Sequence, residues 1–184
     1  MRIVSQFFSI AVLSLSAATA QASLPPEVNA AVPDAKLSAA GTGKLTFFGL
    51  DVYESSLWVS NSFKAPSFDK HFFALELHYL RNFTAQAIAQ RSLEEMNRLE
   101  PLPEQVREQW QTTLQAALPN IKKGDRLIGL HQPGVGVTFW SNGKRSGEIR
   151  DAAFSRQFFA IWLSNKTSEP KLRRAMLAKL DESK

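Results

Sequence analysis

Glu76 and His78 are the side chains of this sequence whose types and spacing best fit acid–base chemistry. They lie two residues apart in the segment FFALELHYL (72–80), whose aromatic and branched residues predict a β-strand. Alternate side chains of a strand share a face, so the carboxylate could orient the imidazole for proton transfer. Alternatively, each group satisfies a cross-strand partner on a half-solvated face. The opposite face, which we expect to be the core side, carries Phe73, Leu75, Leu77 and Tyr79.

Other side chains are suited to holding a ligand. The planar guanidinium of Arg81 fits a carboxylate or an anionic headgroup, although a surface ion pair is an equal alternative. Lys44 and Tyr53 are weaker candidates for holding a carboxylate at the mouth of a pocket. Phe159, together with Trp162, widens the apolar band of a predicted helix. Such residues either make a second packing contact or line a ligand cavity.

The composition excludes several kinds of chemistry. The chain has no cysteine, which rules out disulfides, thiol nucleophiles, thiolate metal sites and iron–sulfur clusters. Of the three histidines, His71 and His78 would face opposite sides of one strand, and His131 has no metal-ligand spacing to either. We therefore expect no metal and no cofactor. A haem held by an axial His or Tyr remains an alternative.

The N-terminus and the charge suggest where the protein works. Arg2, an apolar stretch over 7–18 and small residues up to Ala20 or Ala22 predict a cleaved signal peptide over 1–22. The mature chain should then be a soluble exported protein, most simply in a bacterial periplasm. The net charge of +5 favours anionic partners but is too dispersed for nucleic acid. The basic C-terminal helix could make a weak peripheral membrane contact.

The chain reads as one domain over 41–184, preceded by a flexible Ala- and Pro-rich lead-in over 23–40. Two strands with a bend near Gly49, the strand 72–80 and two helices come first. A strand meander with an Asn142-Gly143 turn and two further helices follow. This order predicts an α+β fold with an antiparallel sheet packed on one face by helices. The predicted strands are 44–50, 52–60, 72–80, 125–131, 135–141 and 145–149, and the helices are 84–98, 103–118, 151–163 and 170–180.

Four blocks of the sequence resemble the chalcone isomerase-like family, in its bacterial exported branch. They are 43–59 (GKLTFFGLDVYESSLWV), 73–82 (FALELHYLRN), 124–129 (GDRLIG) and 139–163, and the closing TSEPKLRRAML also matches. The resemblance implies an open-faced sandwich of one antiparallel sheet and a helical layer. Plant enzymes of the family cyclise chalcones to flavanones, and related members with the same fold bind fatty acids without chemistry.

The resemblance also implies where a ligand would be held. The position of the family's strand Arg falls near Lys44, and its strand Thr falls near Phe48 or Gly49. Its helix Tyr and Asn fall near Phe83 and Gln90, and its polar pair falls within 159–161. Most of these hydrogen-bonding groups are therefore replaced by apolar ones. Steering a phenoxide and an enolate requires donors placed where charge develops, so chalcone cyclisation is disfavoured.

We therefore expect a non-catalytic domain that binds a small apolar or amphipathic ligand, such as a fatty acid, between sheet and helices. The expected ligand-binding residues are Lys44, Tyr53, Arg81, Phe83, Gln90 and Phe159. Two alternatives remain open: an isomerase or intramolecular lyase that uses Glu76 and His78 on an enone-type substrate, and a haem-binding periplasmic protein. A pure interaction module without a pocket is a further alternative.

Overall fold

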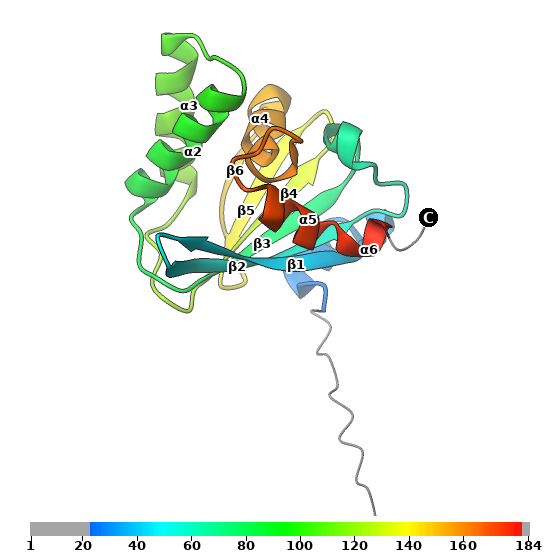
Figure 1. Ribbon diagram of the computed structural model, residues 1–184. Coiled ribbons are helices and arrows are strands. Elements are labelled where there is room, and N and C mark those ends of the chain that lie inside the picture. Colours follow the sequence, from blue (N-terminus) through cyan, green and yellow to red (C-terminus); the bar gives the residue numbers. More distant parts are fainter. Residues whose placement is uncertain (1–22, 182–184) are drawn as a thin grey trace, which may run out of the picture.

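A single antiparallel sheet of six strands organises the molecule. The computed structural model describes residues 23–181, and the strands lie side by side in the order β1 to β6 (Figure 1). Each strand therefore pairs with its neighbour in sequence, as the predicted meander requires. The strands are β1 (Ser38–Phe47), β2 (Leu50–Val59), β3 (Phe73–Tyr79), β4 (Arg126–Gln132), β5 (Gly136–Ser141) and β6 (Lys144–Ile149).

Within residues 23–181, the helices α2 to α6 form a layer over one face of the sheet, which confirms the predicted α+β arrangement. The helix α3 packs against β6, α4 against β5, and α5 and α6 against β1 (Figure 1). Local signals fix where two helices begin, because Thr84 and Asp151 accept hydrogen bonds from the first turns of α2 and α4. The helices are α2 (Ala85–Leu99), α3 (Glu104–Ala117), α4 (Ala152–Leu163), α5 (Pro170–Met176) and α6 (Ala178–Asp181).

The main core lies between the sheet and these helices and is rich in aromatic side chains. Phe73, Leu75, Leu77 and Tyr79 of β3 all point into it, as their alternation predicted. Phe159 of α4 is completely buried, and its ring meets that of Phe73 edge to face at 4.7 Å. Aromatic pairs in this geometry add to the stability that burial alone supplies.

The segment 23–40, predicted as a flexible lead-in, is folded in the structure. It forms α1 (Pro26–Ala31), a 3₁₀ turn η1 (Pro33–Ala35) and the start of β1, and it crosses the sheet face opposite the helical layer (Figure 1). Val28 is completely buried there against a second apolar cluster that includes Trp58 and Trp140. Burial of Val28 comes from tertiary contact, which the local Ala- and Pro-rich composition does not reveal. The predicted signal peptide, 1–22, lies outside the described residues.

Within residues 23–181, no helix is long and apolar enough to cross a membrane.

Candidate functional site

The structure divides the predicted site residues among four places. Lys44, Glu76 and His78 lie on the sheet face opposite the helical layer, and Tyr53 and Phe159 lie in the main core. Arg81 and Phe83 follow the end of β3, and Gln90 lies on the outside of α2. The residues expected to line one cleft between sheet and helices are therefore not brought together.

Glu76 and His78 each have a partner on a neighbouring strand. Glu76 Oε2 lies 3.3 Å from Nε of Arg126 on β4, whereas His78 Nδ1 lies 3.8 Å from Oε2 of Glu54 on β2. Burial raises the pKa of Glu76, and the nearby Arg126 opposes that shift. In the described structure no hydrogen bond joins Glu76 to His78. The arrangement therefore matches the cross-strand alternative better than an oriented acid–base pair.

Lys44 is also engaged on this outer face. Its Nζ lies 2.9 Å from Oδ2 of Asp51 and 3.7 Å from Oε1 of Glu54, and the hydrogen bond to Asp51 raises the pKa of the lysine. Lys44, Glu54 and His78 are direct neighbours in the strand register. They form an exposed polar row that points away from the helical layer.

Tyr53 and Phe159 are parts of the packed core. The Tyr53 hydroxyl accepts a hydrogen bond of 2.9 Å from Nε1 of Trp162, and burial raises the pKa of Tyr53. Phe159 lies directly over Gly129 of β4, where an added Cβ would come within 3.0 Å of the ring. Side chains of α4 thus fill the space in which the ligand was expected.

The remaining predicted residues are scattered. Arg81 is exposed after β3, and Phe83 is half-buried with its ring 5.6 Å from that of Tyr79. Gln90 is exposed on α2, where its amide donates a hydrogen bond of 3.2 Å to Oε1 of Glu94.

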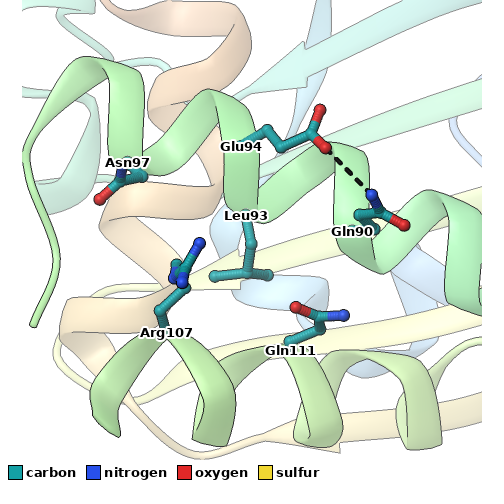
Figure 2. A pocket seen from close by; sticks show the side chains of 6 residues that line it. All are labelled: Gln90, Leu93, Glu94, Asn97, Arg107 and Gln111. Atoms are coloured by element: carbon teal, nitrogen blue, oxygen red, sulfur yellow. Dashed lines mark hydrogen bonds between the residues drawn. The ribbon is translucent and has the colours of Figure 1, made fainter. Parts of the chain in front are cut away.

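Gln90 does line a pocket, which lies between α2 and α3. Figure 2 shows the pocket with Leu93 at its centre and polar side chains around it. Its volume is about 360 Å³. Its cation, Arg107, pairs with Glu104 of the same helix. The lining residues are Gln90, Leu93, Glu94, Asn97, Arg107 and Gln111.

A larger pocket lies where α4 begins. It has a volume of about 600 Å³, within the range of small-molecule sites. Four elements form it: the end of η2 (Ala65–Lys70), the end of β4, the β4–β5 turn and the first turns of α4. The lining residues are Asp69, Lys70, His131, Pro133, Gly134, Ala152, Ala153 and Arg156. We call this the α4 pocket.

The α4 pocket combines two cations, Lys70 and Arg156, and one acidic residue, Asp69, with small apolar walls. Lys70 is exposed at one side, and Arg156 lies on α4 with its Nη2 3.0 Å from Oε2 of Glu100. The N–H groups of Ala152 and Ala153 have no acceptor within the helix because they belong to its first turn. These donors and cations suit a carboxylate.

His131 forms the buried inner side of the pocket. Its Nδ1 lies 2.7 Å from Oγ of Ser155, and its Nε2 lies 3.0 Å from the backbone oxygen of Asp69. The carbonyl can only accept, so Nε2 carries the proton and Nδ1 accepts from the serine hydroxyl. Burial lowers the pKa of His131. The ring stacks on Phe73 at 4.8 Å, which connects the pocket to the main core.

The Ser155–His131 pair resembles a nucleophile and a base, but its burial argues for a positioning role. Ser155 is 0% exposed and His131 is 1% exposed, so a substrate in the pocket does not reach the serine oxygen. The sequence indicates His131 only as a possible metal ligand, and nothing in the sequence distinguishes Ser155. Their separation of 24 residues offers no local signal. Among residues 23–181, no group of three or more His, Asp or Glu side chains could hold a metal ion.

Comparison with known proteins establishes the family. A family model described as chalcone isomerase-like matches residues 16–178. The chain belongs to the chalcone isomerase-like family. No curated protein sequence matches it.

Among solved structures, this chalcone isomerase-like chain is similar to a fatty-acid binding protein of Arabidopsis thaliana. The two share 12% sequence identity with a TM-score of 0.59, over 78% of this chain and 87% of the plant protein. At that identity the likeness shows a common fold. It confirms the open antiparallel sheet with a helical layer.

Proposed function

We propose that this chalcone isomerase-like protein is an exported, non-catalytic binding protein for a small amphipathic carboxylate such as a fatty acid. The observation that carries the proposal is the α4 pocket, where Lys70 and Arg156 face small apolar walls. A carboxylate would lie beside Lys70, Arg156 and the free N–H groups of Ala152 and Ala153, and its tail would lie along Pro133 in the β4–β5 turn. The shared fold with a plant fatty-acid binding protein supports the same ligand class.

Two further observations support a role in binding rather than in catalysis. The Glu76 and His78 side chains are engaged by Arg126 and Glu54 on the sheet face away from the pocket. The buried Ser155–His131 pair gives the pocket a rigid inner side instead of an accessible nucleophile. The proposal that the protein is exported rests on the N-terminal sequence pattern. The mass of protein recovered from a periplasmic fraction tests whether the predicted signal peptide, 1–22, has been removed.

The binding proposal is tested by titrating a fluorescent fatty acid into the purified protein. We expect saturable 1:1 binding. The double variant Lys70→Ala/Arg156→Ala should weaken it by roughly tenfold or more, because the carboxylate loses both charge-assisted partners.

Arg107→Ala is the matched control, since it removes an arginine from the smaller pocket between α2 and α3. It should change the affinity by no more than roughly twofold. If Arg107→Ala weakens binding and the double variant does not, the ligand occupies the α2–α3 pocket. A wild-type protein that shows no saturable binding contradicts the proposed function itself.

A further inference from the structure

The turn between β1 and β2 exposes an unusual amount of apolar surface. Phe47 is 57% exposed, Phe48 is 89% exposed and Leu50 is 53% exposed. The two phenylalanine rings lie edge to face at 4.5 Å. We call Phe47, Phe48 and Leu50 the hairpin tip. Large apolar side chains that gather at an exposed turn mark an interaction surface more often than scattered ones do.

The backbone of this turn makes Phe48 more unusual still. Phe48 and Gly49 have φ values of 47° and 75°, and the β5–β6 turn repeats this geometry with 49° at Asn142 and 80° at Gly143. Asn-Gly is the favoured pair for such a turn, whereas a bulky residue with positive φ is an outlier. The backbone conformation thus disfavours Phe48, and its ring packs on the exposed ring of Phe47 and not on the core. Its exposed ring therefore points to a role outside the folded domain.

Exposed cations lie in the loops at the same end of the sheet. Leu80 N donates to Val52 O at 2.9 Å, which places the loop after β3 beside the start of β2. Lys123 N donates to Asn82 Oδ1 at 2.7 Å, and Asn142 Nδ2 donates to Asp125 Oδ1 at 2.9 Å. These contacts connect the loops from β3 to β6 along one end of the sheet, to the left in Figure 1.

Four exposed side chains at this end form what we call the basic rim: Arg81, Lys122 and Lys123 in the loops and Lys144 at the start of β6. Within residues 23–181, none of them forms a salt bridge. The two carboxylates at this end already have partners, because Asp51 binds Lys44 and Asp125 binds the Lys122 N–H and Asn142. The basic rim is therefore free to attract an anionic partner.

We propose that this end of the sheet docks on a bilayer that carries anionic phospholipid headgroups. The hairpin tip would enter the interfacial region, and the basic rim would contact the headgroups. Apolar side chains beside lysine and arginine are the combination that interfacial membrane binding requires.

A second copy of the chain fits the surface less well. With roughly 200 Å² for each large apolar side chain, the hairpin tip exposes roughly 400 Å². A stable dimer needs about 800 Å² from each partner. The positive charge of the rim would also repel its own copy.

Flotation with lipid vesicles tests the proposal on protein recovered from cells that express the full chain. Vesicles of phosphatidylcholine with phosphatidylglycerol should bind the protein, and vesicles of phosphatidylcholine alone should bind it at least roughly tenfold more weakly. Phe47→Ser/Phe48→Ser should reduce binding at least roughly tenfold because the apolar contact is lost. Lys122→Glu/Lys123→Glu should reduce binding to a similar extent and remove much of its salt dependence.

Matched controls lie elsewhere on the surface. Val135→Ser removes a side chain that is 46% exposed in the β4–β5 turn, at the opposite end of the sheet. Lys171→Glu/Arg174→Glu removes two exposed cations of α5. Neither change should alter vesicle binding by more than roughly twofold. Thermal melts establish that all variants fold.

Three outcomes would overturn the proposal. The first is that folded wild-type protein does not bind the anionic vesicles. The second is that Lys171→Glu/Arg174→Glu in α5 abolishes vesicle binding whereas Phe47→Ser/Phe48→Ser at the hairpin tip leaves it intact. The third is that the protein dimerises through the hairpin tip. In that case Phe47→Ser/Phe48→Ser would halve the mass of the protein in solution, and vesicles would bind neither the wild type nor the variant.

Discussion

His131 is the residue on which the inner side of the α4 pocket depends. Its ring has a hydrogen bond at each nitrogen and is buried against Phe73. The histidine is therefore held neutral, with its proton on Nε2. A neutral, fixed ring suits a pocket wall, because an apolar ligand tail that packs beside it does not remove a charge from water.

This burial predicts a pH dependence of stability. The pKa of His131 is lower in the folded protein than its ordinary value of about 6.5. As the pH falls below that value, the unfolded chain takes up a proton and the folded chain does not. The free energy of unfolding should therefore decrease as the pH falls below about 6.5. The stabilisation that comes from keeping His131 neutral is complete only above that pH.

Urea unfolding at about pH 7.5 and about pH 5.5 measures this contribution. His131→Gln has no imidazole at this position, so its stability should fall less than that of the wild type between the two pH values. An equal fall in the two proteins would contradict the assigned protonation.

Among the elements, the β1–β2 hairpin shows how function can oppose stability. Phe48 occupies a left-handed position that Asn142 fills in the equivalent β5–β6 turn. Phe48→Asn should therefore raise the free energy of unfolding by about 1 kcal/mol, since asparagine tolerates this conformation and phenylalanine does not. Urea unfolding checks the change.

The same substitution should weaken vesicle binding, because it removes the most exposed ring. Leu50→Asn is the matched comparison, since it removes apolar surface without changing the turn residues. It should not stabilise the hairpin. A Phe48→Asn protein that is less stable than the wild type would show that the ring contributes packing that its exposure conceals.

The elements also show what local sequence can predict. Alternation in 72–80, the caps Thr84 and Asp151, and the turn at Asn142-Gly143 are local signals, and the structure contains the strand, the helices and the hairpin that they indicate. The segment 23–40 was mispredicted because Val28 is buried by strands distant in sequence. The local composition of a segment does not reveal a contact with strands that are distant in sequence.

The candidate site was harder to predict for the same reason. Lys70, His131 and Arg156 come from three separate elements, and the contacts of His131 span 62 and 24 residues. Tyr53 and Phe159 were predicted at a cleft, where the structure shows a packed core. Aromatic residues at helical spacing fit either role, and only the tertiary structure distinguishes them.

At the scale of the whole molecule, the two proposed surfaces lie at opposite ends of the sheet. The α4 pocket includes the β4–β5 turn, whereas the hairpin tip and the basic rim lie at the other ends of the strands. A membrane bound at one end would leave the pocket open at the other. Changes at the hairpin tip should therefore leave fatty-acid affinity unaltered, and the two proposals can fail separately.

Fatty-acid binding by the wild-type protein can be tested by native mass spectrometry of protein purified without detergent, before and after addition of palmitate. We expect a 1:1 adduct with the mass of a fatty acid in the wild type and in Arg107→Ala. The adduct should be lost in Lys70→Ala/Arg156→Ala. A wild-type mass that remains that of the bare chain after palmitate addition would contradict fatty-acid binding. An adduct with the mass of haem would support the haem alternative instead.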